Sequence, residues 1–169
     1  MKESKLLIFI VEDNEMYSTM LDYILSKENT HQFIRFSSGE KCMENIYLNP
    51  DVVILDYGLP GMDGLETLFN IKKYSANIPV IILTGNKNLS VAKKLLDSGA
   101  FDYIYKEDAD VVSLIIATMN NALSISKQVH NTRKERKRRY VKITCALLII
   151  ILIIVGIGLA TGNSTKLFR

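Results

Sequence analysis

Five short apolar runs, each rich in β-branched residues, alternate with segments of helical length in the first 125 residues of the chain. The segments between the runs repeat apolar residues at helical spacing. Nearly continuous apolar strands are typical of a parallel sheet covered by helices on both faces. The alternation therefore predicts an α/β, doubly wound fold with a five-stranded parallel sheet, its strands at 6–11, 33–36, 52–55, 80–83 and 103–105.

Charge divides the chain of 169 residues into two opposite parts. Up to Ser124 there are 11 basic and 17 acidic residues, a net charge of −6, and the remainder has 10 basic residues and 1 acidic residue, a net charge of +9. This balance argues against a nucleic-acid-binding domain and favours contact with membrane lipids. Two cysteines, Cys42 and Cys145, are too few for a disulfide framework and indicate a reducing compartment. The length excludes a large multidomain enzyme.

The run ITCALLIIILIIVGIGLAT at 143–161 contains 19 residues without a charge. As a helix it would measure about 28 Å, close to the hydrocarbon thickness of a bilayer. The sequence predicts one C-terminal transmembrane helix here. A fully buried core helix is the alternative, but it needs a surrounding protein layer that the rest of the chain is too short to supply.

Basic residues are concentrated before this run, with seven in 133–142 and two after it. The positive-inside rule then predicts a cell-membrane protein with a single pass and a cytoplasmic N-terminal domain. No N-terminal signal peptide is expected. We expect a domain at 1–125, a basic and helical juxtamembrane linker at 126–142, the span at 143–161 and a short tail at 162–169.

The last helix of the domain is expected to begin near Asp108. Its apolar residues follow coiled-coil spacing, which would suit a homodimer, but packing against the sheet explains the same pattern. Packing is favoured because Thr and Ala make a poor seam, and a homodimer stays open. The residues concerned are Val111, Ile115, Thr118, Ala122, Ile125 and Val129.

Polar residues follow four of the predicted strands. Glu12 and Asp13 follow the first, Asp56 the third, Thr84 the fourth and Lys106 the fifth. In an open parallel sheet these ends meet at one edge. Three converging carboxylates repel one another unless a hard cation neutralises them, and oxygen ligands suit Mg²⁺. A lysine beside them can hold an anion such as a phosphoryl group.

Four segments carry a specific resemblance: VED at the first strand end, ILDYGLPGMDGLE around Asp56, LTG at the fourth strand end and SGAFDYIYK before the fifth loop. Together they resemble the receiver domain of two-component response regulators, over about residues 4–125. The resemblance implies a flavodoxin-like sheet of strand order 2-1-3-4-5. It implies a histidine kinase or phosphotransfer protein as phosphodonor and Mg²⁺ as cofactor.

By the same resemblance, Asp56 is the phosphoacceptor and Asp13 a Mg²⁺ ligand. Glu12 takes a metal-side role, direct or through water, and the backbone carbonyl of Gly58 provides a further ligand. Glu12 stands where the family often has Asp, which keeps the charge on a longer side chain.

Thr84 is implied to hydrogen-bond the phosphoryl oxygens, Lys106 to pair with the phosphoryl group, and Tyr103 to be an aromatic switch. Glu107 follows Lys106 where the family usually has proline, and the preceding peptide bond is then typically cis. Because a cis bond before a non-proline residue is costly, we expect a trans bond and a rearranged loop.

The resemblance also implies that Gly58 and Asn86, two residues after Asp56 and two after Thr84, flank the path by which water reaches a phosphoryl group on Asp56. Gly58 has no side chain to shield it, and the Asn86 amide is able to orient a water. Both features suggest a short-lived phosphoaspartate. The equally open alternative is that Gly58 serves the backbone of a tight loop and that Asn86 is solvated.

The leading functional hypothesis is a membrane-anchored receiver that accepts a phosphoryl group on Asp56 and signals by contact with an unknown downstream protein. No enzymatic activity is expected beyond Mg²⁺-dependent self-phosphorylation and dephosphorylation, and no output domain is expected after the receiver. A phosphatase of the haloacid dehalogenase type is disfavoured, because its D-x-D pair is replaced by Glu12, Asp13 and Asn14. A phosphorylation-independent scaffold or a phosphate sink remains as the alternative.

Overall fold

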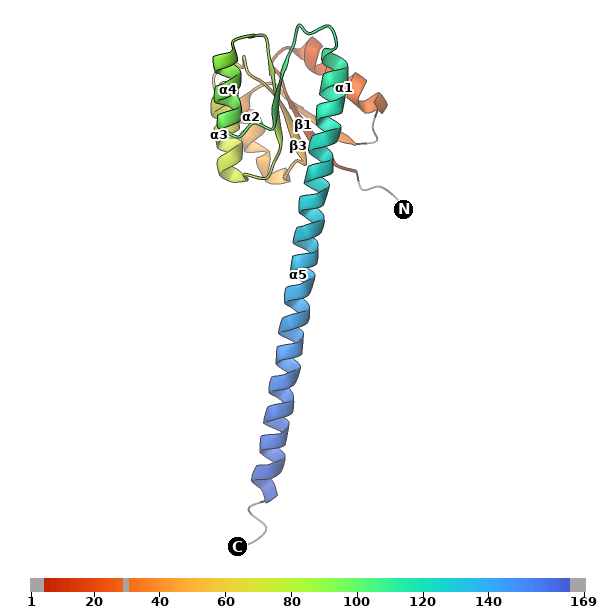
Figure 1. Ribbon diagram of the computed structural model, residues 1–169, viewed down its shortest axis with the longest axis vertical. Helices are drawn as coiled ribbons and strands as arrows, with labels where there is room; N and C mark the ends of the chain where they lie inside the picture. Colours follow the sequence, from red (N-terminus) through yellow and green to blue (C-terminus); the bar gives the residue numbers. More distant parts are fainter. Residues whose placement is uncertain (1–4, 29–30, 165–169) are drawn as a thin grey trace. The chain divides into compact units, whose positions relative to one another are not determined.

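The computed structural model describes residues 5–28 and 31–164 (Figure 1). The chain divides into two compact units, one that ends at Lys127 and one that begins at Gln128. The first contains all the strands, which are β1 (Leu7–Val11), β2 (Gln32–Phe36), β3 (Val52–Asp56), β4 (Val80–Thr84) and β5 (Asp102–Tyr105). The helices are α1 (Glu15–Glu28), α2 (Gly39–Glu44), the short 3₁₀ helix η1 (Ile46–Leu48), α3 (Gly64–Tyr74), α4 (Leu89–Asp97) and α5 (Val111–Ser164).

All strand pairs are parallel, and the order in the sheet is β2-β1-β3-β4-β5. The predicted flavodoxin-like topology and each of the five predicted strands are thereby confirmed. Val11 pairs with Phe36 on one side and with Leu55 on the other. Because Val11 lies opposite Leu55, Glu12, which follows β1, and Asp56, the last residue of β3, lie at the same edge of the sheet.

Helices cover both faces of the sheet, as the apolar runs predict. Figure 1 shows α2, α3 and α4 on one side, with α1 and the first part of α5 on the other. Successive side chains of the central strands point to opposite faces of the sheet. On β1, Ile8 and Ile10 face the α1 and α5 side, whereas Phe9 and Val11 face the α2, α3 and α4 side. The sheet is therefore buried on both faces.

The first turns of α5 pack against the sheet. Ile115, Met119 and Ala122 are buried in the core cluster that also holds α1. The apolar spacing at the start of this helix therefore reflects packing within the domain, as the sequence favours. Ile125, at the next position of the spacing, is 41% exposed.

The second unit is helical from Gln128 to Ser164. In the part of the chain that the structure describes, no helix combines the length and apolar character needed to cross a membrane. Most of the predicted span, from residue 150 to 161, has side chains outside the described residues, as does the whole of the predicted tail. At Ile143, Leu147, Leu148 and Ile149 more than half of each side chain's surface is exposed.

Close contact between α3 and the end of β3 requires a glycine at position 64. A Cβ there would lie 2.5 Å from the Asp56 carbonyl oxygen and 2.5 Å from the Tyr57 Cα, both backbone atoms. The Gly64 N–H donates to the Tyr57 carbonyl at 3.1 Å. The loop that begins after Asp56 is therefore fixed by direct backbone packing.

We predict that Gly64→Ala lowers the free energy of unfolding by about 2 kcal/mol, because the backbone has to move to admit the methyl group. A urea titration followed by tyrosine fluorescence measures the loss. Gly85→Ala is the matched control: a Cβ at Gly85 meets nothing within 4 Å, and this variant should stay within about 0.5 kcal/mol of the parent. Equal stabilities of the two variants would contradict the packing argument.

Candidate functional site: a carboxylate cluster with a bridging lysine

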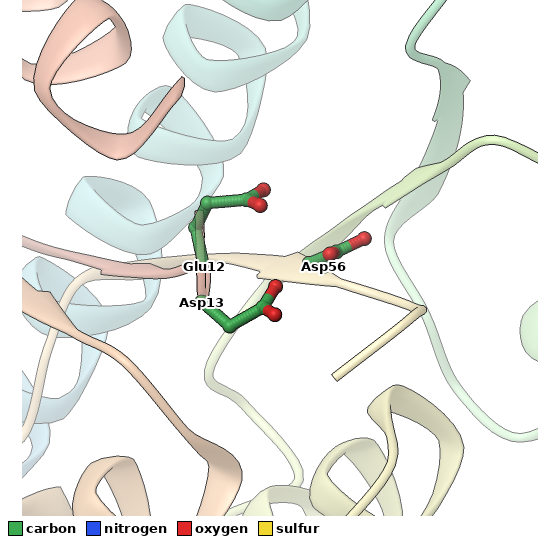
Figure 2. Close-up of side chains that lie close together, drawn as sticks. All are labelled: Glu12, Asp13 and Asp56. Carbon is green, nitrogen blue, oxygen red and sulfur yellow. The ribbon is translucent and has the colours of Figure 1, made fainter. Parts of the chain in front are cut away.

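Three carboxylates converge at the carboxyl edge of the sheet. Glu12, Asp13 and Asp56 each offer an oxygen within 4.8 Å of the others. Figure 2 shows Glu12 and Asp13 together at the end of β1, with their side chains directed toward the end of β3 that carries Asp56. Glu12 and Asp56 are buried, at 4% and 6% exposure, whereas Asp13 is exposed. The sequence predicts this convergence from the strand ends, and the structure brings the three residues together.

Lys106 bridges the two buried carboxylates. Its Nζ donates to Glu12 Oε2 at 2.7 Å and lies 3.0 Å from Asp56 Oδ2. Burial alone would lower the pKa of Lys106, but the hydrogen bonds to Glu12 and Asp56 outweigh it and the pKa lies above its ordinary value. The ammonium is therefore firmly charged and compensates part of the negative charge of the cluster.

The surroundings of Glu12 oppose the ionisation of its carboxyl group. Burial raises its pKa above the ordinary value, and the neighbouring Asp56 charge adds to the rise, while the Lys106 hydrogen bond opposes it. Its other oxygen, Oε1, accepts the Asn14 N–H at 3.3 Å. Both oxygens are thus held, which fixes the side chain toward the site.

Thr84 ends β4 beside the cluster and is buried, at 2% exposure. Its hydroxyl oxygen accepts the Asn86 N–H at 3.0 Å, and its carbonyl accepts the Lys106 N–H at 2.8 Å. The Asn86 side chain is exposed, and its Oδ1 accepts the Asn88 N–H at 2.8 Å. The oxygen of the Asn86 side-chain amide therefore helps to shape the loop after β4.

Gly58 lies directly beside the Asp56 carboxylate. Its N–H donates to Asp56 Oδ1 at 3.1 Å, and an added Cβ would lie 3.8 and 3.9 Å from the two carboxylate oxygens, at ordinary contact distance. Among the described glycines, only Gly61 and Gly99 have a positive φ. Gly58 therefore does not have the positive φ that would require a glycine, and its N–H holds the turn that follows Asp56.

The loop after β5 has no cis peptide bond in the described chain, so the bond between Lys106 and Glu107 is trans, as predicted. Glu107 accepts a 2.5 Å hydrogen bond from the Tyr105 hydroxyl, and this bond raises the pKa of Tyr105. Lys87 lies over the Tyr105 ring, 4.4 Å from its centroid. These contacts join the loops that follow β4 and β5.

Tyr103 on β5 is half-buried and packs against the cluster under α2, α3 and α4. Its proposed role as a switch stays a prediction. The sequence analysis missed Tyr17, whose ring lies 4.8 Å from Lys106 Nζ. Its position gives a signal, because Tyr17 lies in the first turn of α1, which begins two residues after Asp13 at the same edge of the sheet.

The donor set fits a hard divalent cation. All three side chains offer carboxylate oxygens, which Mg²⁺ prefers. Two of them are buried, and among the described residues Lys106 is the one cation that forms an ion pair with them. The exposed side chain, Asp13, leaves the cluster open to solvent on one side. Glu12, Asp13 and Asp56 are therefore the residues that would hold the ion.

The fold and this edge together define a flavodoxin-like α/β protein with an acidic site at the end of its central strands. Residues 8–127 match the response regulator receiver domain. The chain belongs to this family, whose members bind Mg²⁺ at such an acidic site.

Several characterised proteins are similar to the chain. The regulatory protein AtoC of Escherichia coli is 30% identical over 127 residues, which cover 73% of this chain and 27% of AtoC. The response regulator VraR of Staphylococcus saprophyticus is 29% identical and covers 87% of this chain and 74% of VraR. A receiver domain from Clostridium thermocellum superposes with a TM-score of 0.67 at 27% identity, covering 73% of this chain and 98% of that domain.

The share of each relative that is matched differs widely. The chain spans 27% of the length of AtoC and 60% of that of the transcriptional regulatory protein DegU of Brevibacillus brevis. The chain is thus similar to only part of each of these two proteins, and the similarity supports the receiver fold.

We predict that Mg²⁺ binding weakens as the pH falls from neutral, beginning at a higher pH than for a solvent-exposed glutamate. Burial raises the pKa of Glu12, so a proton competes with the metal for this carboxylate earlier than usual. Isothermal titration calorimetry at a series of pH values measures the affinity. In Glu12→Gln the affinity should be lower and nearly independent of pH in this range. The same pH dependence in both proteins would contradict the assignment.

Proposed function

We propose that this chain is a signalling receiver that takes a phosphoryl group onto Asp56 from a histidine kinase or phosphotransfer protein. The observation that carries the proposal is the Lys106 bridge between Glu12 and Asp56, with Asp13 in reach of the same space. A structural ion pair needs one carboxylate, whereas three carboxylates and one ammonium leave a negative site that suits a cation and a phosphoryl group.

The chemistry follows from these positions. An oxygen of Asp56 attacks phosphorus as the bond to the donor's leaving atom breaks, and the leaving group keeps that electron pair. In the proposed transfer, Lys106 neutralises phosphoryl oxygens and the Thr84 hydroxyl donates a hydrogen bond to one of them. A bound Mg²⁺ supplies further charge neutralisation. The proposed chemistry of the chain is limited to this transfer and to hydrolysis of the product.

Asp56 is predicted to be the sole site of phosphate uptake. The whole chain is incubated with Mg²⁺ and a small acyl phosphate, and intact mass spectrometry counts the phosphoryl groups. Asp56→Asn removes the nucleophile and should abolish uptake, because an amide is a poor nucleophile. Asp51→Asn is the control, since Asp51 precedes β3 at the opposite edge of the sheet and should leave uptake unchanged. Equal uptake by Asp56→Asn and the parent would remove the proposal.

The phosphorylated state is proposed to be short-lived, which suits a rapidly reset signal or a phosphate sink. Hydrolysis requires water to attack phosphorus opposite the Asp56 oxygen, with cleavage of the bond from phosphorus to that oxygen. Gly58 places no side chain beside the carboxylate, and its backbone accepts one at ordinary contact distance. The open approach is thus a property of the residue type rather than of the backbone.

Gly58→Leu is predicted to lengthen the phosphoaspartate lifetime about fivefold, which corresponds to about 1 kcal/mol in the barrier. After removal of the donor, the decay is followed by intact mass. Asn86→Ala tests the other flank and should lengthen the lifetime if the amide orients the water. A Gly58→Leu variant that takes up phosphate and loses it at the parent rate would contradict the argument from access.

Membrane anchoring by residues 143–161 is part of the proposal, with the receiver on the cytoplasmic side. Two features support it: the concentration of basic residues immediately before the segment, and the exposed side chains of Ile143, Leu147, Leu148 and Ile149 at its start. Large apolar side chains of this density are costly to leave in water. A lipid environment would remove that cost.

The orientation is predicted to protect the receiver from protease added outside intact cells, since the basic flank holds it on the cytoplasmic side. Immunoblotting with an antibody to the receiver reads the result, and cells opened with detergent provide the control in which digestion occurs. Replacing three residues of the segment with lysine, as in Leu147→Lys, Leu148→Lys and Ile149→Lys, should release the chain from the membrane fraction. Digestion of the receiver in intact cells would overturn the orientation.

A further inference from the structure

Tyr17 is a residue at the edge of the site for which the phosphoryl chemistry gives no role. It lies on α1 and packs against the core cluster on the α1 and α5 side. Its hydroxyl is buried, and in the part of the chain that the structure describes no group hydrogen-bonds to it. Buried tyrosine hydroxyls usually have a partner. The ring, rather than the hydroxyl, makes the polar contact of this side chain.

That contact is with the lysine of the site. Lys106 Nζ lies 4.8 Å from the centroid of the Tyr17 ring, within the range of about 6 Å for a cation–π interaction. The same ammonium contacts Glu12 at 2.7 Å and Asp56 at 3.0 Å. The lysine is therefore held by the Tyr17 ring on α1, by the Glu12 carboxylate after β1 and by the Asp56 carboxylate at the end of β3.

The three contacts respond differently to the reaction. The carboxylates of Glu12 and Asp56 are also the oxygens that a cation would take, and Asp56 loses its carboxylate character when it carries a phosphoryl group. The Tyr17 ring is not altered by either event. It is thus the one of these three contacts to Lys106 that does not depend on the chemical state of the site.

Lys106 has need of such a contact. A lysine side chain has high rotamer entropy, so holding its ammonium in one place requires several partners. Its backbone N–H donates to the Thr84 carbonyl. The next residue, however, is the exposed Glu107 and not a proline, whose ring would restrict the backbone. The position of the Lys106 ammonium therefore depends more on its side-chain contacts than it would if a proline followed.

We propose that Tyr17 is a positioning residue for Lys106, whose ring face keeps the lysine ammonium over the carboxylate cluster before and after Asp56 is phosphorylated. The consequence for phosphoryl transfer rests on the function proposed above, whereas the placement of Lys106 does not. A purely structural Tyr17 would be replaced equally well by any apolar side chain of similar size.

The test compares Tyr17→Phe, which keeps a ring, with Tyr17→Leu, which fills the core without one. The Tyr17 hydroxyl has no hydrogen bond in the described chain for the phenylalanine to lose. The matched control is Tyr23→Leu. Tyr23 is exposed and lies farther along the same helix, and Lys27 Nζ lies 4.2 Å from the centroid of its ring. All variants are made in the whole chain, solubilised in detergent.

The first readout needs no phosphate. The rate at which acetic anhydride modifies Lys106 at one fixed pH is measured by peptide mass spectrometry, because a lysine released from its contacts reacts faster. We expect about a fivefold faster reaction in Tyr17→Leu, and parent rates in Tyr17→Phe and Tyr23→Leu. The second readout is the rate of phosphorylation at saturating acyl phosphate, which should fall about fivefold in Tyr17→Leu and be restored in Tyr17→Phe.

The outcomes separate this inference from the proposed function. A faster modification of Lys106 in Tyr17→Leu, in a protein that takes up no phosphate, supports the positioning role and overturns the function. Equal modification rates in Tyr17→Leu and Tyr17→Phe overturn the positioning role, whatever the phosphate uptake. If Tyr17→Leu does not fold, pentafluorophenylalanine at position 17 keeps the shape of the ring and removes its attraction for cations, and an unchanged Lys106 rate then overturns the proposal.

Discussion

Electrostatic repulsion at the carboxyl edge of the sheet is the constraint on which the arrangement of the site depends. Two like unit charges about 4 Å apart repel by roughly 4 kcal/mol in a partly buried environment. Glu12 and Asp56 are both buried, and the fold holds them together with Asp13 within 4.8 Å. Lys106 offsets part of this repulsion, and the remainder makes the site receptive to a cation. The repulsion among the three carboxylates thus lowers the stability of the fold, and the same repulsion favours the binding of a cation.

The fold could be predicted almost completely from the sequence. Each of the five apolar runs is long enough for one strand and too short for a buried helix, and the segments between them are of helical length. Parallel pairing follows, because β1 and β3 are apolar throughout and have to be covered on both faces. The ends of the strands then determine which polar residues meet. Glu12, Asp13, Asp56 and Lys106 could be assigned to one edge for this reason.

Contacts that depend on side-chain direction could not be predicted in this way. A periodic pattern places Tyr17 on α1, but only packing decides that its ring faces the Lys106 ammonium. The backbone angle at Gly58 is likewise invisible in the sequence, because glycine is used both for positive φ and for open space. Here a close approach that needs a glycine is at Gly64, six residues farther along, whereas a Cβ at Gly58 would meet the Asp56 carboxylate at ordinary contact distance.

Sequence separation gives the Lys106 bridge a consequence for the order of folding. The lysine and Glu12 are 94 residues apart, and Lys106 follows the last strand of the sheet. In a chain synthesised from its N-terminus, the carboxylates of β1 and β3 can therefore meet before the compensating ammonium has emerged from the ribosome. Closing so long a loop is slow compared with forming a helix. The acidic edge is for that interval a source of strain in the growing sheet, and docking of β5 both completes the core and relieves it.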